Sequence, residues 1–161
     1  MNTHLLAPVE HAVVVPVDVD TAFRLYVTRP GRTHPSDGLS GDPTEIVYEP
    51  HVDGRWYERD RTGREHDWGR VLVWDPPRRL TLAWMVGAST GVWAYDPDPA
   101  HASRADITFE PVESGTRVRV RHTGFERHGA TGESIRRGAR GGWVEDLDDL
   151  LRAVRSAGGA R

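Results

Sequence analysis

The chain of 161 residues has no cysteine and no lysine. Without cysteine there is no disulfide, no thiol nucleophile and no cysteine-ligated zinc. Without lysine there is no Schiff-base chemistry through a lysine amine. The 21 basic residues are therefore all arginine, and 24 acidic residues outnumber them. Because the arginines are also scattered, we expect no nucleic-acid partner.

Long apolar runs are missing as well, and none approaches the length needed to cross a bilayer. The opening residues, "MNTHLLAPVEHAVVV", lack the basic region and apolar stretch of a signal peptide. We therefore expect no membrane insertion and a cytoplasmic location. The eight histidines show no HExxH spacing, and neither a phosphate-binding glycine motif nor a G-x-S-x-G elbow occurs. We expect no metal and no cofactor.

At 18.0 kDa the chain is predicted to form one domain over residues 1–161 that buries its own core. The pattern at 18–28 predicts a short helix capped by Asp18 or Asp20, and 29–44 reads as a loop. Alternating and β-branched residues between short turns predict strands at 9–17, 44–50, 54–60, 65–75, 79–86, 104–112 and 115–125, with a fragment at 92–95. Strands segregated from helices in this way predict an α+β fold with an antiparallel sheet.

The C-terminal segment changes to a helical period, with an apolar stripe at Ile135, Ala139, Trp143, Leu147, Leu150, Leu151 and Val154. Three glycines at 138, 141 and 142 oppose a continuous helix, because each costs roughly 1 kcal/mol relative to alanine. Either the helix proper begins near Gly142, or the glycines allow a bend or a close approach to the sheet. One hypothesis is that 134–142 and the 29–44 loop form a flexible mouth to a cavity.

Four stretches together resemble a known family: "VVVPVDVDTAFRLYV", "GRVLVWDPPRRLTLAW", "ADITFEPVESGTRVRVRHTGF" and "GGWVEDLDDLL". They are similar to the activator of heat-shock protein 90 ATPase homologues, of the START-like (SRPBCC) superfamily. The resemblance implies a helix-grip fold, in which a curved antiparallel sheet of about six to seven strands wraps around the long C-terminal helix and leaves an internal cavity. Members of the superfamily bind lipids, sterols, polyketides or plant metabolites, and some are cyclases or aromatases.

Six tryptophans stand out in so short a chain. They either fill the core or line a cavity, offering flat apolar walls and an indole N–H to orient a ligand. Strand alternation and the helical stripe place nine residues where they would line such a cavity. We expect these residues to bind the ligand: Trp56, Trp68, Leu82, Trp84, Phe109, Val120, His122, Trp143 and Leu147.

Three polar residues are candidates for catalysis. His122 alternates with inward-facing valines, so it either orients a ligand carbonyl or moves a proton, or is a core histidine with its hydrogen bonds satisfied. Glu58 and His66 fall on adjacent predicted strands beside tryptophans. They form either an acid–base pair or part of the cross-strand charge pairing of a wet sheet face.

Three functions therefore stand open. The first is a binding protein for an apolar or aromatic, lipid-like or polyketide-like small molecule. The second is an enzyme of the polyketide cyclase/aromatase kind, and the third is a cochaperone-like interaction module with a chaperone partner. An exposed strand edge would also allow a homodimer.

Overall fold

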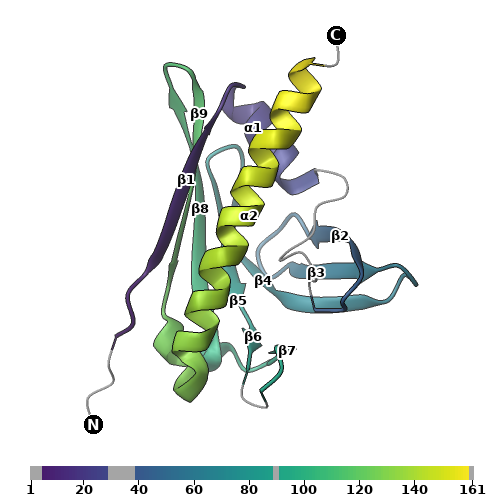
Figure 1. Cartoon of the computed structure of the whole chain (residues 1–161), viewed down its shortest axis with the longest axis vertical. Coiled ribbons are helices and arrows are strands. Elements are labelled where there is room, and N and C mark those ends of the chain that lie inside the picture. The colour runs from purple at the N-terminus through teal and green to yellow at the C-terminus, as the bar shows by residue number, and fades with distance from the viewer. Residues whose placement is uncertain (1–4, 29–38, 89–90, 160–161) are drawn as a thin grey trace.

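The computed structural model describes residues 5–28, 39–88 and 91–159 (Figure 1). Seven strands form one antiparallel sheet in the order β1-β9-β8-β5-β4-β3-β2. Their bounds are β1 Val9–Val15, β2 Pro43–Tyr48, β3 Arg55–Asp60, β4 Glu65–Asp75, β5 Arg79–Trp84, β8 Ser103–Val112 and β9 Gly115–Thr123. The remaining elements are helices α1 (Val19–Thr28) and α2 (Gly132–Gly159), 3-10 helices η1 (Pro99–His101) and η2 (Phe125–Thr131), and the small strands β6 (Val86–Gly87) and β7 (Ala94–Tyr95).

Helix α2 crosses the inner face of the curled sheet, with α1 near its C-terminal end and the β6–β7 pair near its N-terminal end (Figure 1). This arrangement confirms the predicted α+β, helix-grip-like fold. The wing formed by β2, β3 and the adjoining part of β4 turns away from the helix. The core lies between α2 and the inner face, where the stripe residues Ile135, Ala139, Trp143, Leu147, Leu150 and Val154 are all buried.

Strand β9 shows how the sequence sets the two faces of the sheet. Val118, Val120 and His122 are buried, whereas the arginines between them are exposed. Successive side chains of a strand point to opposite faces, so the alternation seen in the sequence is confirmed residue by residue. Asp18 is the predicted cap of α1, because its carboxylate accepts the N–H of Thr21 at 2.7 Å.

The glycine-containing segment at the start of α2 is helical without interruption from Gly132 to Gly159. The alternative in which the helix begins near Gly142 is therefore wrong. Gly138 permits a close approach, but to Trp93 rather than to the main sheet, since a Cβ there would overlap the indole ring. Of the second proposed mouth segment, residues 29–38 lie outside the described part of the chain.

Strand β4 bends where its register with β3 and β5 shifts. A Cβ on Gly69 would overlap the carbonyl oxygen of Ala83 and touch the ring of Trp56 at 3.3 Å. The missing side chain lets the neighbouring backbone and ring approach, as is common at bulges. Within the described residues, no helix is both long and apolar enough to span a membrane.

Candidate functional site

The inner face of the sheet carries a continuous cluster of tryptophan rings. Trp56 stacks on Trp68 with centroids 5.6 Å apart, and Trp68 meets Trp84 edge-on at 5.1 Å. Trp143 reaches Trp84 from α2 at 6.0 Å, and Trp93 reaches it from the loop before β7 at 5.9 Å. These five residues are called the tryptophan cluster below.

Three indole N–H groups of the tryptophan cluster donate within the protein. Trp68 donates to Glu58, Trp84 to the carbonyl of Val86, and Trp143 to His122, at 2.7, 2.9 and 3.0 Å. Aromatic side chains with a polar tip usually find such partners when buried. These hydrogen bonds within the protein therefore hold the three rings in place.

Glu58 is fully buried at one end of the cluster. Its carboxylate accepts hydrogen bonds from the indole of Trp68, from the backbone N–H of Leu39 at 2.7 Å, and from both the N–H and the hydroxyl of Ser40. A buried carboxylate needs such donors, because desolvation without them is costly. Glu58 thus connects the segment before β2 to the inner face of the sheet.

His66 lies opposite Glu58 in the register of β3 and β4, as strand adjacency predicted. Its imidazole, however, bonds to Asp60 at 2.9 Å, while Glu58 is bonded to Trp68 and the 39–40 segment. The hydrogen bond from His66 is the main cause that lowers the pKa of the Asp60 carboxyl. The two candidates are therefore neighbours in register with separate hydrogen-bonding partners, and an acid–base role for them remains a prediction.

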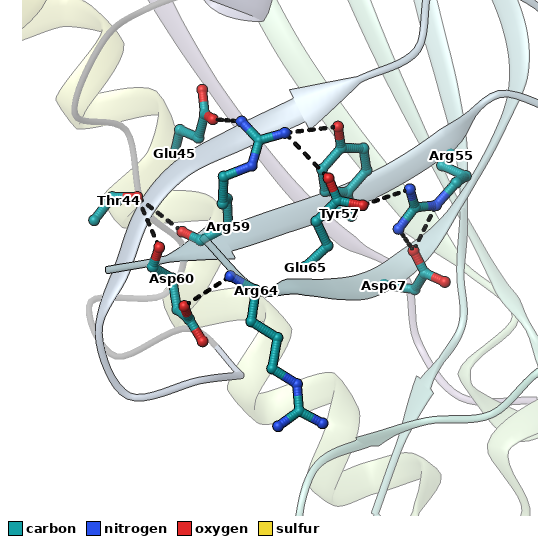
Figure 2. Close-up of polar contacts among 9 residues, drawn as sticks. All are labelled: Thr44, Glu45, Arg55, Tyr57, Arg59, Asp60, Arg64, Glu65 and Asp67. Carbon is teal, nitrogen blue, oxygen red and sulfur yellow. Dashed lines mark hydrogen bonds and ion pairs between the residues drawn. The ribbon is translucent and has the colours of Figure 1, made fainter. Parts of the chain in front are cut away.

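The outer face of the same strands carries cross-strand charge pairs, shown in Figure 2. Arg55 pairs with Glu65 and Asp67, each at 2.8 Å, and Arg59 pairs with Glu65 at 3.1 Å. The guanidinium of Arg55 also lies 4.2 Å from the centre of the Tyr57 ring. Charge pairing on a wet sheet face is thus confirmed for the outward side chains of this hairpin.

A line of hydrogen bonds leads from the tryptophan cluster toward the surface. Nδ1 of His122 accepts from Trp143 at 3.0 Å, and its Nε2 lies 2.7 Å from the hydroxyl of Ser103. The same hydroxyl lies 2.7 Å from Nε2 of His128. These four residues, Trp143, His122, Ser103 and His128, are called the polar chain below.

Four separate elements build the polar chain. Trp143 lies on the stripe of α2, His122 is the last inward residue of β9, and Ser103 begins β8. Gly124, with φ +83°, turns the chain from β9 into η2, which brings His128 back over the start of β8. A left-handed conformation of this kind is one that glycine adopts without strain.

The protons of the polar chain have a definite arrangement. An indole N–H can only donate, so Nδ1 of His122 is an acceptor. Burial lowers the pKa of His122 well below its ordinary value, so the ring is neutral and carries its proton on Nε2, which donates to Ser103. The Ser103 hydroxyl then donates to Nε2 of His128.

His128 is left as a neutral ring with its own proton on Nδ1. Burial lowers its pKa to about 4, so it stays neutral at pH 7. Since Nε2 is occupied as an acceptor, the free polar function of His128 is a hydrogen-bond donor. A neutral imidazole held in one tautomer can donate to a carbonyl oxygen on which negative charge develops.

His128 lines a cleft of about 420 Å³ between η2 and the β6–β7 pair, called the His128 cleft below. This volume falls in the range of small-molecule sites, roughly 300–1,000 Å³. Small and apolar residues form much of its wall: Gly87, Ala88, Val92, Ala94, Pro97 and Gly129. Its polar residues are Tyr95, Asp96, His101, Arg127 and His128.

The rim of the His128 cleft carries a hydrogen-bonded histidine and aspartate. Nδ1 of His101 lies 2.8 Å from Asp96, and this hydrogen bond is the main cause that raises the pKa of His101. The guanidinium of Arg127 donates to the carbonyls of Ala100 and Pro99 at 3.2 and 3.4 Å. The cleft therefore presents a charged rim around a small apolar wall and the His128 donor.

The nine residues expected to bind a ligand are all buried, at 4% exposure or less. Eight of them belong to one core cluster, and His122 joins it through ring contacts with Trp84 and Trp143 at 5.1 and 6.0 Å. Leu82, Val120 and Leu147 are among these packed residues, and Phe109 also lines a separate hollow beside α1. The structure brings the set together, and ligand contact by its members remains a prediction.

Ser103 and His128 are absent from the sequence-based candidates. Ser103 lies just before the strand predicted at 104–112, and His128 follows the last predicted strand in "GFERHGAT" without a recognisable motif. Their significance arises only when β8 and η2 meet. Among the described ranges 5–28, 39–88 and 91–159, no three histidine or acidic side chains are grouped so as to hold a metal ion.

Comparisons with known proteins agree with this fold. The sequence pattern of the family described as activator of Hsp90 ATPase homolog 1-like protein matches residues 41–155. A solved structure described as an anthrahydroquino-γ-pyrone synthase, Txn09, complexed with SUM, shares 32% identity over 93% of this chain and 99% of its own, with a TM-score of 0.62.

More distant solved structures show the same fold. Protein NE0264 of Nitrosomonas europaea is 19% identical, covering 94% of this chain and 96% of its own, with a TM-score of 0.65. An AHSA1-like protein of Aeromonas hydrophila is 18% identical over 94% of each chain, with a TM-score of 0.58. A comparison with the curated proteins found no match.

Proposed function

The chain belongs to the family of activator of Hsp90 ATPase homolog 1-like proteins, and on that premise we propose that it binds a flat, aromatic, ketone-bearing molecule of polyketide type and assists its ring closure. The observation that carries this proposal is the polar chain, which ends in a neutral histidine donor on the wall of the His128 cleft. A fold alone does not assign a function, so the argument depends on this site.

The similarity to an anthrahydroquino-γ-pyrone synthase supports the substrate class, because that protein is 32% identical over almost the whole of both chains. An anthrahydroquinone is a flat, fused aromatic molecule, and γ-pyrone is a ring that contains a ketone and a ring oxygen. The tryptophan cluster and the apolar wall of the cleft suit such a molecule, since aromatic rings bind one another by stacking or edge-on contact.

The proposed reaction is an intramolecular addition followed by loss of water. A phenolic oxygen of the substrate forms a bond to the carbon of a ketone within the same molecule, and its proton ends on the former ketone oxygen. Elimination of that hydroxyl with a neighbouring hydrogen releases one water and completes the pyrone ring, so no oxidant or reductant is needed. Nδ1–H of His128 donates to the ketone oxygen while negative charge develops on it.

A second candidate function is binding without turnover. It is favoured by the low pKa values of His122 and His128, because burial makes both rings weak bases. A histidine of this kind orients a carbonyl well but removes a proton poorly. The two candidates therefore differ in whether the bound molecule is released unchanged.

A ring-closure assay distinguishes them. The probe is an o-hydroxyphenyl β-diketone, which closes to a chromone with loss of one water, and the reaction is followed by absorbance. We expect the protein to accelerate closure and His128→Phe to lower the rate roughly a hundredfold, the effect typical of losing one donor to a developing oxyanion. His51→Phe is the control, because His51 is an exposed histidine in another turn.

Three outcomes are informative. Acceleration that depends on His128 supports the cyclase. Saturable binding of the probe without chromone formation, weakened by His128→Phe, supports the binding protein. Equal rates for the protein, both variants and buffer, together with no binding, would contradict the proposed function.

A further inference from the structure

Trp93 occupies a flat slot beside the His128 cleft. One wall of the slot is the bare backbone of α2 at Gly138, where a Cβ would overlap the Trp93 ring. The other walls are Trp68 and Trp84, whose rings lie 6.5 and 5.9 Å from that of Trp93 and nearly perpendicular to it, at 79° in each case. A slot of this shape accepts the flat face of an aromatic ring against the helix and its edges against the tryptophans.

Among the residues that the structure describes, the walls of the slot are not specific for an indole. The contacts of its walls are apolar and aromatic, and they depend on a ring being flat rather than on its substituents. Gly138 is what makes room for a ring of this thickness on α2. Gly141, one turn further on, has open space around it and contributes nothing comparable.

The hairpin that delivers Trp93 is short. Two residue pairs, Val86 with Tyr95 and Gly87 with Ala94, join β6 to β7, and the N–H of Asp96 donates to the carbonyl of Met85 at 2.7 Å. The hairpin thus has few ladder hydrogen bonds compared with the strands of the main sheet. Val92, next to Trp93, is 68% exposed. Segments with few buried contacts and a short ladder open at low cost compared with the core.

The slot and the His128 cleft are adjacent along the chain. Val92 and Ala94, on either side of Trp93, both line the cleft. Trp84, which forms a wall of the slot, also lies 5.1 Å from the ring of His122 in the polar chain. Residues 92–94 therefore form a border that the slot and the His128 cleft share.

We infer that the slot between Gly138, Trp68 and Trp84 is the ring-binding part of the ligand site, and that Trp93 fills it until a flat aromatic ligand displaces it. This inference rests on the proposed function and adds where the ring binds and which residue competes with it. The ligand class is a fused, planar aromatic ketone, whose ring enters the slot while its oxygen faces the cleft.

The test is equilibrium binding of 1,8-dihydroxyanthraquinone, measured by dialysis so that changes in tryptophan content do not affect the signal. Trp93→Ala removes the competitor, and we expect it to bind the probe at least tenfold more tightly than the unchanged protein. Gly138→Ala places a methyl group in the slot, and we expect it to bind at least tenfold more weakly. Gly141→Ala is the matched control, with the same chemical change on the same helix but in open space, and it should bind like the unchanged protein.

A permanent core role for Trp93 predicts different results. Binding that is weakened or unchanged in Trp93→Ala would overturn the inference, and so would unchanged binding in Gly138→Ala. If these results come with His128-dependent binding in the unchanged protein, the proposed function stands and the slot alone is wrong. Absence of probe binding in every variant, Trp93→Ala included, would overturn both. Circular dichroism of each variant shows whether it is folded. If Trp93→Ala does not fold, the binding of the probe to Gly138→Ala, compared with Gly141→Ala, decides the test.

Discussion

The residues of the site differ in how well the surrounding sequence predicts their position and role. The inward direction of His122 follows from the alternation of β9, and it is fully buried as that pattern requires. Ser103 and His128 gain their importance from a meeting of β8 and η2, elements separated by the whole of β9. A long-range contact of this kind leaves no periodic signal in the chain, so two of the four members of the polar chain could not be predicted.

Glu58 gives a prediction at the same scale. Glu58→Gln replaces one carboxylate oxygen by an NH₂ group, which must then face at least one of the donors Trp68, Leu39 or Ser40. Because a buried donor without an acceptor costs about 1–3 kcal/mol, we expect the free energy of unfolding to fall by that amount. Urea denaturation measures it, with exposed Glu113→Gln as a control that should change little. Equal stability of the two variants would contradict the anchoring role of Glu58.

At the scale of single helices and strands, packing depends on where a glycine lets a neighbouring side chain or backbone come close. The glycines of α2 left three alternatives open from sequence, because helix propensity alone cannot distinguish a break from a packing contact. The continuous helix and the Trp93 contact at Gly138 decide between them. The contact that decides between them comes from Trp93, more than forty residues away in the chain. The sequence around the glycines therefore could not reveal it.

Strand β4 provides the prediction at this scale. Gly69→Ala places a methyl group onto the carbonyl of Ala83 and against Trp56, so backbone must shift. We expect a loss of about 1–3 kcal/mol in the free energy of unfolding, as for other overpacked sites. Gly87→Ala in β6 is the matched control, since its Cβ would meet open space. A thermal melt of both variants measures the difference, and equal melting temperatures would show that the bulge does not need glycine.

The whole molecule should respond to acid through its buried histidines. The pKa of His122 is lowered by burial and that of His128 is lowered to about 4, whereas an unfolded histidine titrates near 6.5. Below pH 6.5 the unfolded chain therefore binds protons that the folded chain does not, and stability falls as pH falls toward 4. Exposed His101, whose pKa is raised by its bond to Asp96, acts in the opposite direction.

Unfolding in urea at a series of pH values tests this dependence. We expect the free energy of unfolding to decline as pH falls below 6.5, with a slope of up to about 1.4 kcal/mol per pH unit for each excluded proton. His128→Phe should flatten the decline, and His51→Phe should leave it unchanged. A decline of the same steepness in the protein and in His128→Phe would contradict the low pKa of His128.

The overall architecture followed from sequence more completely than the site did. Strand alternation, short turns and the helical stripe are local patterns, and they predicted the antiparallel sheet and the long helix that the structure contains. The family resemblance is likewise confirmed over residues 41–155. The His128 cleft forms where β6–β7, η1 and η2 meet, and short elements of this kind carry little pattern of their own.

The central claim, that the polar chain holds His128 as a neutral donor, is tested most directly by the ¹⁵N NMR shifts of the histidine rings at pH 6. Neutral rings in the two tautomers and the charged ring give distinct pairs of shifts, and His128→Phe and His51→Phe assign the signals. We expect His122 to be neutral with its proton on Nε2, and His128 to be neutral with its proton on Nδ1. A charged His128, or a neutral one with its proton on Nε2, would contradict the arrangement on which the proposed function depends.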